Sequence, residues 1–229
     1  MVLSELRRYV ALGDSYSAGL PGDAHLSWPA MLADELRRTA PDLAYWNLAV
    51  VGATTREVLS SQLPAALERR PELVTVVCGL NDVLYSVRPD VVLFEASFMA
   101  IVRALRSTRD APVVLTATVP DLSRFVPFRP RSRARVARGI DGVNRVVRAI
   151  SARYGCRVVD IERSPHGSDP ASFASDGIHA SALGHARMAE GALDEIRRWA
   201  RSAATPGSLP TGLQPRREKT RVSDRFRIG

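Results

Sequence analysis

Five short apolar runs, separated by segments with helical periodicity, recur along this 229-residue chain. The runs are rich in valine, isoleucine and leucine and do not alternate strictly with polar residues, which is typical of strands covered on both faces. A strand followed by a helix, repeated five times, favours a parallel sheet with helices on both faces. The pattern predicts an α/β fold, a three-layer α/β/α sandwich with a five-stranded parallel sheet. The expected strands are Tyr9–Leu12, Tyr45–Val50, Leu73–Cys78, Val113–Thr118 and Cys156–Ile161.

The segments between the runs carry helix signals. Thr54-Thr55-Arg56-Glu57 has the form of a capping box, and Pro29 stands in the first turn of a predicted helix, where proline is tolerated. The longer segments place apolar residues on one stripe. The expected helices cover residues 27–36, 54–63, 91–106, 132–154 and 182–199.

The character of the sequence changes near Ala203. Residues 205–229 contain three prolines and many arginines and show no apolar period. Such a segment cannot bury enough apolar surface to fold with the rest. We therefore predict one folded domain over residues 1–202 and a flexible arginine- and proline-rich tail over residues 203–229.

The net charge of +8 bears on possible partners. Lys219 is the only lysine among 32 basic residues, an arginine excess typical of the codon bias of a GC-rich genome. Basic charge attracts phosphates without sequence specificity. Because no nucleic-acid-binding motif and no row of stacking aromatics accompanies it, we expect no specific nucleic-acid partner.

Composition also bears on compartment and cofactors. No apolar stretch approaches the roughly 20 residues of a membrane span, and the N-terminus lacks the pattern of a signal peptide, so we expect a cytoplasmic protein without a membrane span. Cys78 and Cys156 lie in or beside predicted strands and are expected to be buried and unpaired. The cysteines and histidines show no zinc-ligand spacing, and neither a metal nor another cofactor is expected. The sequence leaves the oligomeric state open.

Four polar blocks follow predicted strands or precede the last helix. Open parallel sheets bind ligands at the carboxyl ends of their strands, so these blocks should meet at one edge. Each has an ordinary alternative as a turn, a cap or a polar loop, but their chemical groups are complementary: a hydroxyl, a glycine amide, a side-chain amide and an Asp/His pair. The blocks centre on Ser15 in Gly13-Asp14-Ser15, on Gly52, on Asn81 in Gly79-Leu80-Asn81-Asp82, and on Asp176 and His179 in Ser175-Asp176-Gly177-Ile178-His179.

Together these blocks resemble those of the SGNH hydrolases, the GDSL-type esterase and lipase family, over residues 8 to about 200. The resemblance implies the flavodoxin-like fold of that family and a Ser15–Asp176–His179 triad. In that triad Ser15 attacks an acyl carbonyl, His179 moves the proton and Asp176 orients the imidazole. The implied oxyanion hole consists of the Ser15 and Gly52 N–H groups and the Asn81 side-chain amide.

The activity implied by the resemblance is hydrolysis of carboxylic esters through an acyl-enzyme, with a small-molecule acyl ester as substrate and no cofactor. A thioesterase or acyltransferase with the same triad, and a catalytically silent binding module, remain alternatives. The ordinary α/β-hydrolase is disfavoured because Ser17 stands where its nucleophile elbow needs a second glycine.

Other polar residues receive structural interpretations. Asp14 and Asp82 are expected to brace their turns, and His25, His166 and His185 are expected on loops or helix surfaces. The loops Leu20–Ser27, Val83–Pro89 and Pro120–Arg131 are expected to line the site. For Phe125 and Phe128, among the arginines of the last loop, two interpretations stand: an acyl-binding patch beside an anionic group, or a solvated basic loop.

Overall fold

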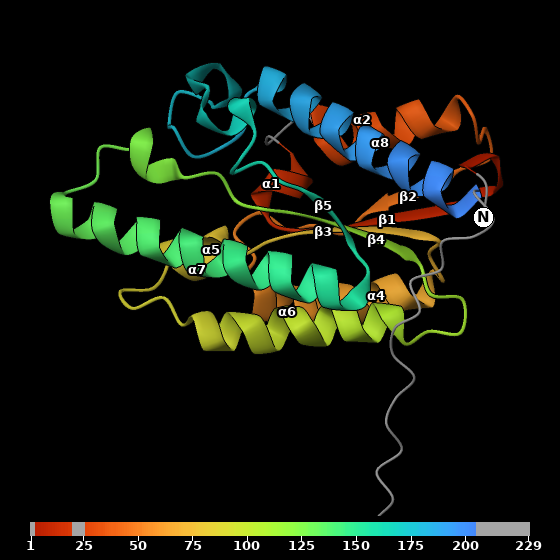
Figure 1. Ribbon diagram of the computed structural model, residues 1–229, viewed down its shortest axis with the longest axis horizontal. Helices are drawn as coiled ribbons and strands as arrows, with labels where there is room; N and C mark the ends of the chain where they lie inside the picture. The colour runs from red at the N-terminus through yellow and green to blue at the C-terminus, as the bar shows by residue number, and fades with distance from the viewer. Residues whose placement is uncertain (1–2, 20–25, 205–229) are drawn as a thin grey trace, which may run out of the picture.

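The computed structural model describes residues 3–19 and 26–204 (Figure 1). Five strands, every neighbouring pair parallel, form one sheet in the order β2-β1-β3-β4-β5. The five predicted strands are all present, and the α/β fold class is confirmed. The strands are β1 (Arg8–Gly13), β2 (Ala44–Asn47), β3 (Leu73–Val77), β4 (Val113–Ala117) and β5 (Arg157–Val159).

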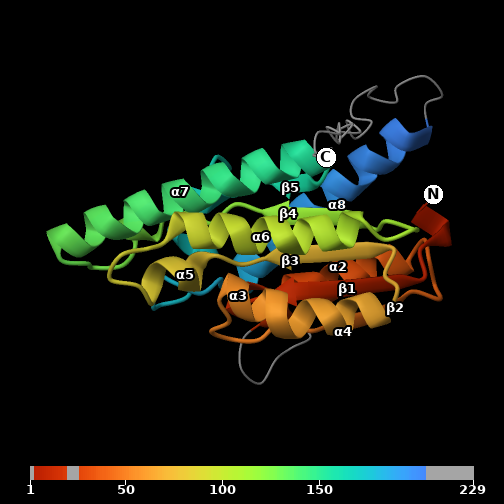
Figure 2. The same ribbon diagram turned by 90° about the horizontal axis from the view of Figure 1, so that it is seen from below.

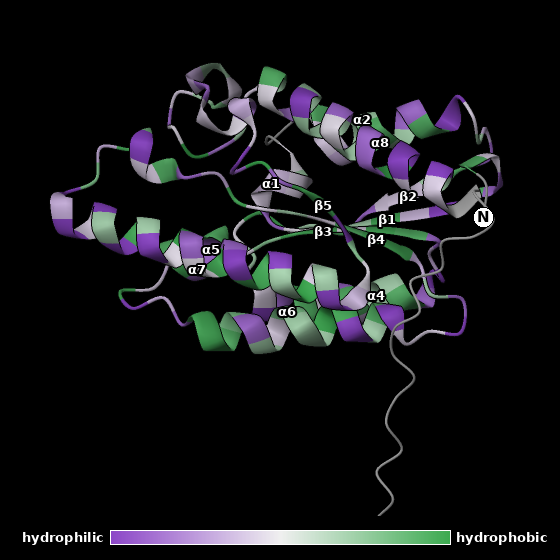
Figure 3. Cartoon of the chain, viewed as in Figure 1, coloured by the Kyte–Doolittle hydropathy of each residue, from purple (hydrophilic) through white to green (hydrophobic). Residues whose placement is uncertain are grey.

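Helices cover both faces of the sheet. Helices α2 (Trp28–Arg37) and α8 (Ala182–Ala204) pack together on one face. Helices α4 (Leu63–Glu68), α6 (Val91–Arg106) and α7 (Pro130–Tyr154) lie on the other (Figures 1 and 2). Figure 3 shows the apolar residues concentrated in the strands and polar residues on the outer faces of the helices. The core therefore lies in the two layers between sheet and helices, as a sheet covered on both faces requires.

The largest buried side chains come from both layers of the core. Most of them lie in a predicted strand or a predicted helix, which agrees with the sequence pattern. They include Tyr9, Trp28, Leu32, Phe94, Phe98, Ile101 and Leu105.

Two strands are markedly shorter than predicted: the fifth covers Arg157–Val159 instead of Cys156–Ile161, and the second ends at Asn47 instead of Val50. The Asn47 side chain explains the early end, since its Oδ1 accepts the N–H of Ala49 at 3.1 Å and turns the chain. Its Nδ2 donates to the carbonyl of Ser17 at 2.8 Å, which ties β2 to the segment after β1.

The predicted helix over residues 54–63 is present as α3 (Thr55–Glu57), a π-helical segment η3 (Val58–Gln62) and the start of α4. Short elements at the carboxyl edge of the sheet were not predicted, among them the single-turn helix α1 (Ser15–Ala18) and α5 (Leu80–Leu84). Three short 3-10 helices follow β4 and β5 at this edge, η4 (Leu122–Arg124), η5 (Pro165–Ser168) and η6 (Pro170–Ser172), and a further one, η1 (Leu3–Glu5), precedes β1.

Two further sequence predictions bear on the whole chain. Cys78 is buried, Cys156 is half-buried, and both are free thiols, in agreement with the expected absence of a disulfide. Helix α8 ends at Ala204 and residues 205–229 lie outside the described residues, so the division into domain and tail stays a prediction. Across residues 3–19 and 26–204, no helix combines the length and apolar content that crossing a bilayer requires.

Candidate active site

Ser15 is the first residue of α1 and follows β1 directly after Asp14. Asp14 Oδ1 caps this helix by accepting the N–H of Tyr16 at 3.0 Å. Gly13 has a φ of +145°, and a Cβ at this position would lie 2.0 Å from the carbonyl oxygen of Val77. Only glycine allows β1 and β3 to approach so closely at this turn. Ser15 itself is half-buried, so the backbone holds its hydroxyl at the carboxyl edge of the sheet and within reach of solvent.

The Gln62 side chain holds this turn through two hydrogen bonds to the backbone of Gly13. Gly13 N–H donates to Gln62 Oε1 at 2.8 Å, and Gln62 Nε2 donates to the Gly13 carbonyl at 2.9 Å. The Gln62 side chain is 4% exposed, so both hydrogen bonds lie in the interior. Sequence reasoning missed this residue, although a glutamine beside the apolar stripe of its helix was a signal that it needs a buried partner.

The first three sequence blocks contain the three hydrogen-bond donors that the resemblance implies for an oxyanion hole. The N–H groups of Ser15 and Gly52 have no acceptor among the described residues. Gly52 has a φ of +83°, which favours glycine at this turn. Asn81 is buried, and its Nδ2 donates to the carbonyl of Ala53 at 3.0 Å. That bond uses one of two Nδ2 hydrogens and leaves the other for a ligand.

Asp82 fixes the Gly52 and Asn81 blocks to each other. Its Oδ2 accepts both the N–H and the hydroxyl of Thr55, each at 3.0 Å. Asp14 and Asp82 thus brace their turns, as predicted. Burial raises the pKa of the Asp14 carboxyl from an ordinary value of 3.8 to about 7, although the Tyr16 N–H acts in the opposite direction.

Asp176 and His179 form a hydrogen-bonded pair on one loop. The Asp176 Oδ2 lies 2.6 Å from His179 Nδ1, and its Oδ1 accepts the N–H groups of Ile178 at 2.8 Å and His179 at 3.0 Å. Partial burial acts to raise the pKa of Asp176, but these hydrogen bonds outweigh it and lower the pKa. Because an ionised carboxylate only accepts, Nδ1 carries the proton, and His179 Nε2 has a lone pair that can act as a base.

A hydrogen bond joins the serine turn to the Asp/His loop. The Tyr16 hydroxyl donates to the carbonyl of Ile178 at 2.6 Å. Tyr16 follows Ser15 and Ile178 precedes His179, so this bond draws the first and fourth sequence blocks together. The Val50 N–H donates to the Gly13 carbonyl at 3.1 Å and brings the Gly52 block to the same edge, so the blocks meet at the edge that the sequence predicts.

The loop after β4 supports the Asp/His loop from the side. A Cβ at Gly177 would lie 3.1 Å from the carbonyl oxygen of Phe125. The ring of Phe125 packs on Phe173, with 4.3 Å between the ring centroids. This contact favours a structural role for Phe125 over the acyl-binding role that the sequence left open.

The remaining histidines divide between the interior and the surface. His185, expected on a surface, is buried at 2% exposure, and its Nδ1 accepts the Trp28 N–H at 3.4 Å. That prediction was wrong because the start of α8 packs against α2. Burial, with a smaller effect from the charge of His179, lowers the pKa of His185 to about 4. His166 is exposed, as predicted, and His25 lies outside the described residues.

A cavity of about 270 Å³ lies behind the Asp/His loop, between the segment after β5 and helix α8. Tyr16 and Arg187 line it, whereas Ser15 and His179 do not. Arg187 is held there by Asp169 Oδ2 at 2.6 Å. Within the described part of the chain, no three His, Cys, Asp or Glu side chains gather as metal ligands do.

Comparison with known families identifies the family of the chain. Residues 11–187 match the GDSL-like Lipase/Acylhydrolase family. The chain belongs to this family. The match covers all four sequence blocks, so the resemblance seen in those residues is confirmed.

Individual relatives agree with the family. The chain is 26% identical to the esterase TesA of Pseudomonas aeruginosa over 182 residues, which are 79% of this chain and 83% of that protein. It is 36% identical to an arylesterase of Vibrio mimicus over 93 residues, 40% of this chain and 46% of that protein. A crystal structure of TesA superposes with a TM-score of 0.68 at 24% identity, covering 83% of this chain and 98% of that one. This likeness confirms the fold.

Proposed function

We propose that this protein hydrolyses carboxylic esters through an acyl-enzyme formed on Ser15. Membership of the GDSL-like Lipase/Acylhydrolase family, with relatives named esterase and arylesterase, supports ester hydrolysis. The observation that carries the finer proposal is the Tyr16–Ile178 hydrogen bond, because it couples the serine turn to the loop of the Asp176–His179 pair.

The acylation step uses a nucleophile, a base with its carboxylate partner, and the donors of the oxyanion hole. Ser15 Oγ forms a bond to the carbonyl carbon of the ester while its proton passes to His179 Nε2. The carbonyl oxygen becomes an oxyanion, which the N–H groups of Ser15 and Gly52 and the Asn81 amide would stabilise. The charge of Asp176 stabilises the imidazolium that forms. When the intermediate collapses, the bond to the alkoxy group breaks and the leaving alcohol takes the proton from His179.

Deacylation repeats these steps with water. His179 Nε2 removes a proton from a water molecule, whose oxygen attacks the acyl carbon of the Ser15 ester. Collapse of this second intermediate releases the carboxylic acid and returns the proton to Ser15 Oγ. The substrate class is therefore a small acyl ester, and no cofactor takes part in the proposed steps.

Hydrolysis of p-nitrophenyl esters of increasing acyl length, with the matching thioesters in parallel, tests the proposal. The Ser15→Ala variant should lose at least about 10⁴-fold in kcat while its unfolding curve in urea stays close to that of the wild type. Ser17→Ala is a matched control in the same turn. Its hydroxyl is buried and has no hydrogen-bond partner among the described residues, so its removal should leave kcat within a few-fold.

The outcomes separate the alternatives. Equal activity of the wild type and Ser15→Ala would show that Ser15 is not the nucleophile. Turnover of thioesters well above that of oxygen esters would identify a thioesterase with the same nucleophile. A folded wild type that is inactive on every ester and thioester would contradict the proposed hydrolysis.

A further inference from the structure

One end of the molecule carries a cluster of arginines. Residues 122–140 contain six arginines and no Asp or Glu. In Figures 1 and 2 the start of α7 projects beyond the sheet at this end, next to the loop that leads into α6. We call the following side chains the arginine surface: Arg88, Arg129, Arg131, Arg133, Arg135 and Arg138.

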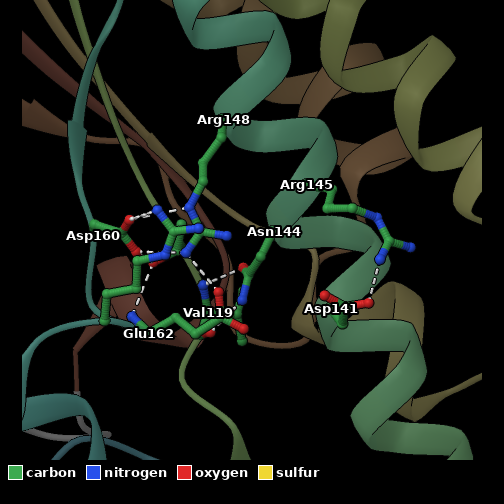
Figure 4. A network of polar contacts seen from close by, with 9 residues as sticks. Val119, Asp141, Asn144, Arg145, Arg148, Asp160 and Glu162 are labelled. Atoms are coloured by element: carbon green, nitrogen blue, oxygen red, sulfur yellow. Dashed lines mark hydrogen bonds and ion pairs between the residues drawn. The ribbon is translucent and has the colours of Figure 1, made fainter.

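The second half of α7 shows what is different about the first half. There Arg148 bonds Asp160 at 2.6 Å and Glu162 at 2.5 Å, and Arg145 pairs with Asp141 (Figure 4). Among the described residues, no member of the arginine surface makes a salt bridge. All except Arg135, which is half-buried, are exposed. An arginine-rich composition alone therefore does not explain this surface, since other arginines of the same helix have acidic partners.

The position of these charges opposes the stability of the helix. The N-terminal end of a helix is the positive end of its dipole, where cations are unfavourable. The first turn of α7 contains no acidic residue, and Arg131 and Arg135 stand four residues apart, a spacing at which like charges repel. An external anion at this surface would relieve both effects.

A hollow of about 300 Å³ concentrates the charge. Arg88, Arg135 and Arg138 line it, and no acidic side chain does. The hollow exists because α5 and the loop before α6 pack directly on α7: a Cβ at Gly139 would lie 2.7 Å from Val83 Cγ1 and 3.2 Å from Pro89 Cγ. Arg135 holds the loop there by donating to the carbonyls of Val83 and Ser86. Three guanidinium groups in one hollow suit the oxygens of a phosphate group.

Exposed apolar side chains accompany the arginines. Val87, which lines the hollow, is 86% exposed, Val92 in the first turn of α6 is 77% exposed and Tyr85 is 69% exposed. A soluble anion would leave these side chains in water, whereas a lipid surface would bury them and leave the arginine head groups among the phosphates. The Tyr85 hydroxyl also lies 3.2 Å from the Cβ position of Gly52, so this surface borders the candidate oxyanion hole.

We propose that this end of the molecule binds the surface of an anionic phospholipid bilayer. Lipid phosphates occupy the hollow between Arg88, Arg135 and Arg138, and Val87 inserts among the lipids beside it. Bound in this way, the edge that carries Gly52 faces a phase in which acyl esters are concentrated. The binding requires no catalysis, and its test is independent of the proposed ester hydrolysis.

Sedimentation of the full chain with vesicles tests this surface. The wild type should bind vesicles that contain phosphatidylglycerol, bind vesicles of phosphatidylcholine alone far more weakly, and dissociate as salt rises. The triple variant Arg88→Gln, Arg131→Gln and Arg138→Gln should bind phosphatidylglycerol vesicles on the order of 100-fold more weakly. Arg135 is left unchanged because its hydrogen bonds hold the loop.

The matched control removes the same charge elsewhere. Arg103→Gln, Arg109→Gln and Arg197→Gln replace exposed arginines that lie outside the arginine surface and make no salt bridge among the described residues. This variant should lose only a few-fold in vesicle binding, because its three substitutions lie outside the arginine surface. Residues 205–229 and their basic charge are the same in the two triple variants, so they do not contribute to the difference between them. Urea unfolding of both variants verifies that they are folded.

Each result is decisive. Retained binding by Ser15→Ala, with loss only in the arginine-surface variant, supports the proposal whether or not the protein hydrolyses esters. Equal losses in the two triple variants, or no binding by the wild type, would overturn it. A lower kcat/KM of the surface variant on a water-soluble anionic ester, without vesicle binding by the wild type, would assign the surface to a soluble anion instead.

Discussion

The candidate site has two halves. Ser15 and its neighbours, the serine half, lie on turns held by buried hydrogen bonds, whereas Asp176 and His179, the Asp/His half, lie on an exposed loop. Asp14 is 1% exposed and Asn81 is 6% exposed. In the interior, Gln62 forms hydrogen bonds with both the N–H and the carbonyl of Gly13. The side chains of Asp176 and His179 are 45% and 40% exposed, respectively. Among the described residues, the hydrogen bond from Tyr16 to Ile178 connects the two halves directly.

This difference in burial predicts which substitutions lower the free energy of unfolding and which lower only the catalytic activity. A buried polar group that loses its partner retains the full cost of its desolvation, so changes at the buried hydrogen-bonding side chains of the serine half, such as Gln62, should destabilise the fold. Exposed groups regain water when a partner is removed. Changes in the Asp/His half should therefore lower activity with little effect on the free energy of unfolding.

The largest expected effect is on catalysis, in the exposed half. His179→Ala should lower kcat on a short p-nitrophenyl ester by about 10⁴-fold, because no other base then accepts the Ser15 proton. Its free energy of unfolding should change by less than about 0.5 kcal/mol. His166→Ala, at an exposed histidine of η5, should change neither quantity. Strong destabilisation by His179→Ala would show that the two halves do not differ as described.

The largest expected effect on stability is in the buried half. Gln62→Ala leaves the N–H of Gly13 without a partner in the interior, and its carbonyl keeps only the bond from the Val50 N–H. The free energy of unfolding measured in urea should fall by about 2–4 kcal/mol. Ser61→Ala, at the exposed neighbouring position, is the control and should be close to the wild type. A loss below about 0.5 kcal/mol for Gln62→Ala would mean that water or another group replaces the amide.

The buried Asp14 of the serine half should make the free energy of unfolding depend on pH. Its folded-state pKa is raised from 3.8 to about 7 by burial, so between those values the folded state binds more protons than the unfolded state. The contribution of Asp14 to the free energy of unfolding is greatest below about pH 4. It falls by up to about 4 kcal/mol as the pH rises to about 7. Asn at this position can still cap α1 but cannot titrate.

The comparison with Asp14→Asn isolates this effect. The free energy of unfolding of the wild type, minus that of the variant, should fall between about pH 4 and pH 7 and then level off. The raised pKa of Asp82 contributes to both proteins and cancels in the difference. Parallel pH profiles for the two proteins would contradict a buried, titrating Asp14.

The smallest expected effect concerns the bond that joins the halves. Tyr16→Phe removes the donor to Ile178 and should lower the free energy of unfolding by about 1 kcal/mol. Because the His179 loop is then less well held, kcat should also fall several-fold, with KM nearly unchanged. Tyr154→Phe, at a half-buried tyrosine on the last turn of α7, serves as control. An unchanged kcat for Tyr16→Phe would show that Asp176 and Phe125 position the loop without this bond.

Local sequence patterns predicted the strands and the longer helices because strand and helix periodicity are set by neighbours in the chain. The same holds for the four site blocks, since a turn at the end of a strand needs glycine and short polar residues. The Asp176–His179 pair was predictable because its members are three residues apart on one loop.

Contacts between distant residues were not predictable in this way. Gly13 and Gln62 are 49 residues apart, and Tyr16 and Ile178 are 162 residues apart. His185 was placed wrongly for the same reason, since its burial depends on how α8 packs against α2. No periodicity within either segment contains that information.

By itself, then, the sequence determined the α/β fold class, the order of strands and helices, and the residue types available for chemistry. The tertiary structure decided which buried polar groups hold the Ser15 turn, how that turn meets the His179 loop, and where the unpaired arginines gather. The physical reason is range: secondary structure follows from hydrogen bonds and apolar spacing within a few residues. The geometry of a site and the charge of a surface arise where segments far apart in the chain pack together.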